Sequence, residues 1–163
     1  MDAQEVESLF PFLQTSTARF LSNTGSKNCI YSPLSVYLSL SILAESSAGE
    51  SREQLLRLLG VDSVETLRVR AGDLWRANYI NKDNTSLLSD TSLLSNSLWL
   101  DEELCYVKDG VDMLARDYYT SVFQGKIGST GYNEQLQNWL NETTKGLLTQ
   151  QAEGIEMDSN TLL

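Results

Sequence analysis

Apolar residues recur along most of the chain at the three- and four-residue spacing of an amphipathic helix. This period predicts six helices, over residues 6–21, 32–44, 51–59, 62–75, 107–118 and 136–147. Pro11 lacks a backbone N–H, so we expect it to kink or split the first helix. Capping-box patterns at 51–54 and 62–65 predict the starts of the third and fourth helices, and Gly60 predicts the end of the third.

The second of these helices has a clear start and an unusual face. Ser32 offers a hydroxyl N-cap, and Pro33 has the preset backbone angle of a first helical residue. Ser35 and Ser39 join Ser32 on one side, because steps of three and four residues return to the same face of a helix. Hydroxyls within an apolar helix predict either close approach of another backbone or a buried hydrogen-bond cluster.

Three short apolar segments lack the helical period and are predicted as strands. They cover residues 28–31, 92–100 and 122–127, and we expect the second to be covered on both faces. The polar stretch 81–90 is predicted as a loop. Residues 150–160 are polar and acidic, and the apolar run 161–163 is interpreted as the first residues of a further strand.

Charge restricts the partners that this chain can have. Its 22 acidic and 12 basic residues give a formal net charge of −10. Such a surface repels the phosphates of nucleic acids and of anionic membranes, so we expect neither as a partner. The most apolar stretch, 30–44, is too short to span a bilayer.

Candidate catalytic chemistry is sparse. The chain has no histidine, which removes the commonest general base and the commonest metal ligand. Cys29 and Cys105 lie far apart without CxxC spacing, and predict two buried free thiols rather than a disulfide or a zinc site. The acidic groups at 101–103 and 153–158 lack the spacing of a calcium loop, and no GxSxG or SxxK motif occurs. We therefore predict no catalytic residue, no metal and no cofactor, and do not expect an enzyme.

Five blocks of sequence resemble the serpin family, in the order in which the family has them. Residues 28–36, Asn-Cys-Ile-Tyr-Ser-Pro-Leu-Ser-Val, are similar to its asparagine, short apolar strand and Ser-Pro helix start, and residues 47–51 resemble the turn that follows. Residues 94–99 resemble the family's Ala-Asn-Ala-Leu-Phe strand, and Tyr118 with Phe123 fits the next helix-to-strand step. Residues 139–148 match the spacing of Trp-Val-x-x-x-Thr-x-Gly-x-Ile, although Gln137 stands where the family usually has asparagine. The motif residues with a structural role by this resemblance are Asn28, Pro33, Asn96, Trp139, Thr144 and Gly146.

The resemblance implies an α+β fold, the N-terminal portion of a serpin, in which about six helices pack on part of a central β-sheet. We expect residues 1–163 to form one serpin-like domain that is incomplete at the C-terminus, without the reactive centre loop or the C-terminal barrel strands. Ser32 and Ser35 fall in the family's shutter region, where the strands of the sheet part, so the helix that carries them should lie buried behind that sheet. Capping and tight packing are the alternative roles for these two serines.

Serpins are suicide inhibitors of serine, and sometimes cysteine, proteases, whose cleaved bait loop inserts as a new strand in the central sheet. The resemblance implies this activity for a full-length protein, with such a protease as its partner, and an extracellular location with the cytoplasm as the alternative. No residue here matches the reactive loop, so we expect this polypeptide alone not to inhibit proteases. We also expect its open sheet edges to favour self-association. The alternative function is a non-inhibitory interaction module whose acidic surface binds a basic partner.

Overall fold

The structure is a computed structural model that describes residues 3–25, 29–80 and 92–158. The chain divides into two compact units. The first comprises Met1–Asn78 together with Arg116–Tyr118, and the second comprises Tyr79–Ala115 together with Tyr119–Leu163. The first unit is therefore assembled from two separate stretches of the sequence.

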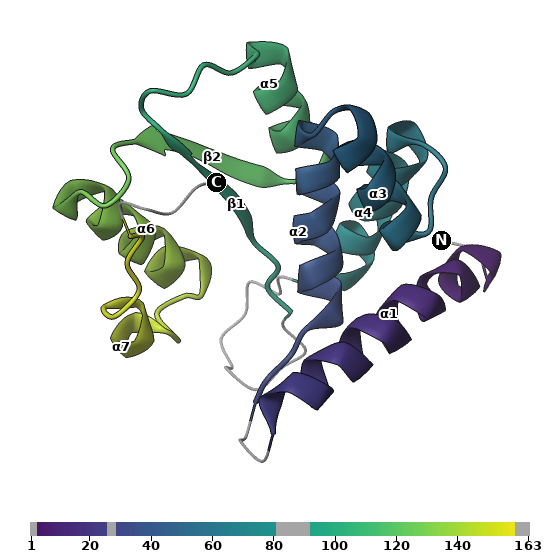
Figure 1. Ribbon diagram of the computed structural model, residues 1–163. Helices are drawn as coiled ribbons and strands as arrows, with labels where there is room; N and C mark the ends of the chain where they lie inside the picture. Colours follow the sequence, from purple (N-terminus) through teal and green to yellow (C-terminus); the bar gives the residue numbers. More distant parts are fainter. Residues whose placement is uncertain (1–2, 26–28, 81–91, 159–163) are drawn as a thin grey trace. The chain divides into compact units, whose positions relative to one another are not determined.

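Four helices build the first unit. They are α1 (Ala3–Thr24), α2 (Pro33–Ser46), α3 (Gly49–Leu59) and α4 (Val64–Asn78), and α2 packs against the other three (Figure 1). The rings of Phe12 and Tyr37 meet edge to face with centroids 5.2 Å apart, and the Tyr37 hydroxyl donates to the Leu59 carbonyl at 3.3 Å. The buried apolar residues of this unit are Leu9, Phe12, Tyr37, Leu38, Ile42, Ala44, Leu56, Leu59, Val61, Leu67, Ala71, Leu74 and Tyr118.

The helix ends follow local chemistry, though not always at the predicted residue. Ser32 caps α2, because its Oγ accepts the Ser35 N–H at 3.2 Å, and Gly60 ends α3 with a left-handed φ of 69°, so both predictions are confirmed. The two predicted capping boxes are wrong. The left-handed backbone of Gly49 (φ 58°) leads into α3 without a side-chain cap, and Ser63 supplies the hydroxyl that accepts the Thr66 N–H.

Further expectations for the first half of the chain are corrected by the structure. Helix α1 continues through Pro11, so the predicted split is wrong, and the alternative of a kink at this residue stays a prediction. The predicted strand at 28–31 is also wrong in its described part, since Cys29–Tyr31 pair with no strand and Ile30 is 99% exposed. The predicted loop at 81–90 lies outside the described residues.

The two cysteines are exposed and free, which corrects the prediction of buried thiols. Cys29 lies in the connection between α1 and α2, and Cys105 lies in the connection after residue 101. Because both side chains are exposed, the small apolar character of cysteine brings no burial at either position.

The second unit contains a parallel pair of strands. Strands β1 (Asn96–Asp101) and β2 (Thr120–Gly125) pair from Asn96↔Thr120 to Asp101↔Gly125, and α5 (Lys108–Asp117) lies between them in sequence. A parallel pair requires such a crossover connection. Both strands were predicted, but Ser92 lies outside β1 and instead forms an antiparallel bridge with Ile80. Within β1 only Trp99 is buried, so the predicted coverage of both faces is wrong for the part of the chain that the structure describes.

An aromatic cluster forms the core of this unit. The remaining described elements of the unit are α6 (Thr130–Thr143) and the short α7 (Thr149–Ala152). The rings of Trp99 and Phe123, which are register partners across the two strands, stack with centroids 4.1 Å apart. Tyr132 and Trp139 of α6 each meet Trp99 edge to face, at 5.2 and 6.3 Å. Aromatic pairs in these geometries stabilise a fold beyond the area that they bury, so the cluster fixes α6 on the strands.

Candidate functional site

Ser32 and Ser35 meet on one face of α2, as the helical spacing predicts. The Ser35 hydroxyl donates to Ser32 Oγ at 2.8 Å, and both side chains are exposed, as is Ser39. The expectation that α2 lies buried behind a central sheet stays a prediction, and the serine face of α2 is exposed within the described residues. The reason is that α2 turns its other face toward α1, α3 and α4.

The fully buried serine of α2 is Ser41, which sequence reasoning did not single out. Its hydroxyl donates to the Tyr37 carbonyl at 2.7 Å, one turn earlier in the same helix. This bond satisfies the hydroxyl within the helix, so burial requires no polar neighbour. Ser41 lies off the stripe of Ser32, Ser35 and Ser39, and its only signal in the sequence is its place among apolar residues.

A buried carboxylate at the end of α2 joins three parts of the first unit. Glu45, whose side chain is 5% exposed, accepts from Arg68 Nη2 on α4 at 2.8 Å and from the Tyr118 hydroxyl at 2.8 Å. Arg68 Nε also lies 3.7 Å from Asp117 Oδ2. A buried charge is tolerated only when it is paired and hydrogen-bonded, and both oxygens of Glu45 meet that condition. We call these four residues the Glu45 network.

The hydrogen bonds and burial of this network shift the pKa values of three of its side chains. Burial, followed by the hydrogen bond to Glu45, raises the pKa of Tyr118, so its hydroxyl remains a donor at neutral pH. The hydrogen bond to Glu45 raises the pKa of Arg68, and the hydrogen bonds from Arg116 lower the pKa of Asp117. The network therefore combines one neutral donor, Tyr118, with two groups, Arg68 and Asp117, whose pKa shifts favour their charged forms.

Three of the four motif residues of the second half lie at the ends of its elements, and the fourth, Trp139, lies within α6. Asn96 begins β1, while Trp139 anchors α6 in the aromatic cluster. Thr144 and Gly146 end α6: the Thr144 hydroxyl donates to the Leu140 carbonyl at 2.7 Å, and Gly146, at φ 79°, donates its N–H to the Asn141 carbonyl at 2.8 Å. Asn28 lies outside the described residues.

Two amides of α6 that the motif did not include hold the segment after α7. Asn133 Oδ1 accepts the Met157 N–H at 2.9 Å, and Gln137 Nε2 donates to the Ile155 carbonyl at 3.2 Å. Gln137 is one of the positions where the chain departs from the family pattern. A glutamine carries the same amide one methylene further out, so the substitution leaves a hydrogen-bonding group in place here.

The acidic triplet 101–103 forms a turn. Asp101 Oδ1 accepts the Glu103 N–H at 2.9 Å, and its Oδ2 accepts the Ile127 N–H at 3.4 Å. Among the described residues, no group of three or more acidic or cysteine side chains is arranged to hold a metal ion. The helices that the structure describes likewise include none with the length and apolar character that a bilayer crossing requires.

Comparison with known proteins decides what these elements belong to. A model of the family described as Serpin (serine protease inhibitor) matches residues 13–163. This chain belongs to the serpin family. Among sequence relatives, Serpin-ZX of Arabidopsis thaliana is 26% identical over 167 residues, covering 100% of this chain and 42% of the relative. Corticosteroid-binding globulin of Ovis aries is 26% identical over 141 residues, covering 83% of this chain and 31% of the relative.

Solved serpin structures share the fold. A serpin from Arabidopsis in its native stressed conformation superposes with a TM-score of 0.78 at 26% identity, over 99% of this chain and 42% of the other. Human thyroxine-binding globulin superposes with a TM-score of 0.75 at 18% identity, over 97% and 41%, which shows the fold alone. The chain thus spans between about a third and two-fifths of the length of these relatives. The predicted α+β fold of a serpin N-terminal portion is confirmed.

Proposed function

We propose that a full-length protein containing these residues inhibits a serine-type, or a cysteine-type, endopeptidase by loop insertion. The observation that carries the proposal is the serpin family match over residues 13–163. The corresponding mechanism needs a metastable fold that releases free energy when the cleaved loop enters the sheet. Residues 1–163 alone would supply helices and strands of the fold but not the reactive loop, so we propose that they do not inhibit a protease by themselves. We also propose that they have no enzymatic activity.

The Ser32–Ser35 pair supports a role for this chain in that mechanism. We propose that these two hydroxyls form the shutter on which strands of the sheet part. The two hydroxyls are hydrogen-bonded to each other, and both belong to small side chains on the solvent-exposed face of α2. A strand that slides past such a face would find a donor and an acceptor for its backbone groups at each step.

Inhibition can be tested on the full-length protein with endopeptidases of trypsin-like, chymotrypsin-like, elastase-like and papain-like specificity. We expect at least one of them to form a covalent complex that survives boiling in detergent and migrates above the protease. Residues 1–163 alone serve as the negative control. Cleavage of the full-length protein by all four classes, without any such complex, would refute inhibition.

The shutter role has its own test in the same protein. Ser35→Ala should change the rate of spontaneous conversion to an inactive form, and should leave the rate of protease association unchanged. Ser39→Ala is the matched control, because Ser39 is an exposed serine of the same face. Equal conversion rates for the two variants would assign Ser35 to capping and packing only.

A non-inhibitory interaction module is the second candidate. The net charge of −10 favours it, and so does the likeness to corticosteroid-binding globulin, a serpin relative named for a ligand that it binds. Its basic partner would bind the acidic surface with an affinity that falls steeply with salt. Salt-sensitive binding of a basic protein together with no protease complex would favour this function.

The full-length inhibitor and residues 1–163 alone are expected to have different partners. For the inhibitor we propose a protease partner and an extracellular location, with a cytoplasmic location as the alternative. Within the described residues, β1 and β2 form a two-stranded sheet, so each has an edge without a neighbouring strand. We propose that these edges allow self-association of residues 1–163, which sedimentation at several concentrations would detect.

A further inference from the structure

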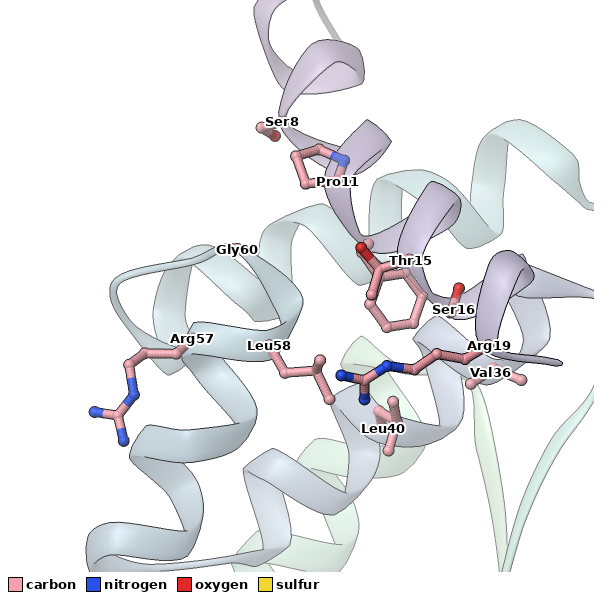
Figure 2. Close-up of a pocket in the computed structure, with 11 residues that line it drawn as sticks. Ser8, Pro11, Thr15, Ser16, Arg19, Val36, Leu40, Arg57, Leu58 and Gly60 are labelled. Carbon is pink, nitrogen blue, oxygen red and sulfur yellow. The ribbon is translucent and has the colours of Figure 1, made fainter. Parts of the chain in front are cut away.

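A pocket of about 350 Å³ opens among α1, α2 and α3 of the first unit (Figure 2). Phe12, Leu40 and Leu58, one from each helix, give it apolar walls. Its volume lies at the lower end of the roughly 300–1,000 Å³ that small-molecule sites span. The pocket therefore suits the apolar body of a small ligand.

Packing around the pocket fixes its shape. The edge-to-face contact with Tyr37 holds the Phe12 ring. At Gly60, which also lines the pocket, a Cβ atom would lie 3.3 Å from the Ser8 carbonyl oxygen, so α1 and the end of α3 approach closely there. The left-handed backbone of Gly60 (φ 69°) permits this turn, and the apolar walls are in place before any ligand arrives.

The charge at the pocket opposes that of the chain as a whole. Two arginines line it, and none of its eleven lining residues is acidic, although the chain has a net charge of −10. Figure 2 shows Arg19 reaching from α1 toward Leu40 and Leu58, whereas Arg57 points outward. Arg57 lies 3.8 Å from Glu53, which already offsets its charge. Arg19 is thus the cation that a ligand in the pocket would meet.

A hydroxyl stands beside that cation. Thr15 lines the pocket four residues before Arg19, and this spacing places the two side chains on the same face of α1. A guanidinium and a hydroxyl together match the two oxygens of a carboxylate, which an arginine can bind through parallel N–H donors. The site therefore combines an apolar wall with an anion-binding end.

We propose that this pocket binds a small amphipathic carboxylate, such as a medium-chain fatty acid. The apolar body would lie against Phe12, Leu40 and Leu58, and the carboxylate would pair with Arg19. This ligand site is independent of protease inhibition, since it uses neither the serine face of α2 nor a reactive loop.

Decanoate is the probe that tests the proposal, with 1-decanol as the neutral analogue of the same chain length. Titration calorimetry on the full chain, below the micelle concentration, should give one decanoate per protein and weaker binding of 1-decanol. Arg19→Gln should weaken decanoate about fivefold, as expected for one partly exposed ion pair, and leave 1-decanol unchanged. Leu58→Gln, at a residue that is 47% exposed, should weaken both probes without unfolding the protein.

A control separates this site from general electrostatics. Lys126→Gln changes the net charge by the same amount at an exposed position outside the pocket, and it should bind decanoate as the parent does. Equal losses in Arg19→Gln and Lys126→Gln, no saturable decanoate binding, or occupation of the pocket by a second copy of the chain would overturn the proposal. Thermal unfolding of each variant checks that its fold is retained.

Discussion

The Tyr118 hydroxyl donates to Glu45 Oε2 at 2.8 Å, although 73 residues separate the two in sequence. The carboxylate is nearly inaccessible to water and has Arg68 as its other side-chain partner. This pairing ties the end of α2 to the residues that follow α5. It is therefore a long-range constraint on the first unit.

Removing that hydroxyl should destabilise the protein measurably. We expect Tyr118→Phe to lower the free energy of unfolding by about 1–3 kcal/mol, because a buried carboxylate loses one of its donors. Urea unfolding, followed by the far-ultraviolet circular dichroism of the helices, measures this change. Tyr106→Phe is the control, since Tyr106 is 49% exposed, and its effect should be close to zero. Equal stabilities for the two variants would contradict the importance of the bond.

Alkaline pH should weaken the fold through its buried tyrosines. Burial is the main cause that raises the pKa of Tyr37, Tyr118 and Tyr132 in the folded state. Above about pH 10 the unfolded chain releases phenolic protons that the folded chain retains, so stability is lost as pH rises. The loss can reach at most about 1.4 kcal/mol per pH unit for each such tyrosine, over the pH range between its unfolded and its folded pKa. Stability that stays constant from pH 9 to 11 would contradict this, and Tyr118→Phe should reduce the slope.

Two glycines should respond to alanine with opposite signs. At Gly125 a Cβ atom would lie 2.6 Å from Tyr132 Cδ2, inside the aromatic cluster, so Gly125→Ala should destabilise by about 1–3 kcal/mol. At Gly110, in α5, no atom lies within 4 Å of a built Cβ. Gly110→Ala should be neutral or stabilise by up to about 1 kcal/mol, because alanine favours the helix. Thermal unfolding of both variants compares them directly.

The turn after α6 contains two consecutive residues in the left-handed region, Lys145 at φ 52° and Gly146 at φ 79°. Alanine at Gly146 should cost about 1–2 kcal/mol, since a Cβ is disfavoured there. Lys145→Gly should have the reverse effect, a gain of a few tenths of a kcal/mol or more, because glycine removes the existing strain. Chemical denaturation checks both values, and a loss of stability in Lys145→Gly would show that its side chain contributes more than the strain costs.

Ser32 and Ser39 share a face of α2 but differ in what they bond. Ser32→Ala removes the N-cap that accepts the Ser35 N–H, and should lower the free energy of unfolding by about 1 kcal/mol. Ser39→Ala changes an exposed hydroxyl within the helix and should be neutral or slightly stabilising. Hydrogen exchange of the first α2 amides would localise the effect, and should accelerate only in Ser32→Ala.

Features that depend on neighbouring residues could be predicted from the sequence. The start of α2 at Ser32-Pro33 and the end of α3 at Gly60 are set by side chains and backbone angles within a few residues of each boundary. The common face of Ser32 and Ser35 follows from helical geometry alone. Its exposure could not be predicted, because that depends on which side of α2 the other helices cover.

Features that depend on distant partners could not be predicted. The apolar composition of residues 28–31 is compatible with a strand, but a strand also needs a neighbour, and Cys29–Tyr31 have none among the described residues. The pairing of Glu45 with Tyr118 has no local pattern, since 73 residues separate the two in sequence. Nor does the cationic pocket, which collects Arg19, Leu40 and Leu58 from three helices.

The assignment of Arg116–Tyr118 to the first unit has a practical meaning for any attempt at dissection. At Gly72 on α4, a Cβ atom would lie 3.1 Å from the Asp117 carbonyl oxygen, so backbone from the two stretches lies almost in contact. A polypeptide excised at Asn78 would leave this surface of α4 bare and Glu45 short of one donor. A minimal version of the first unit must therefore carry the tripeptide Arg116–Tyr118 as an added segment. Any continuous stretch of the chain that contains both parts of this unit also contains strand β1 of the second unit.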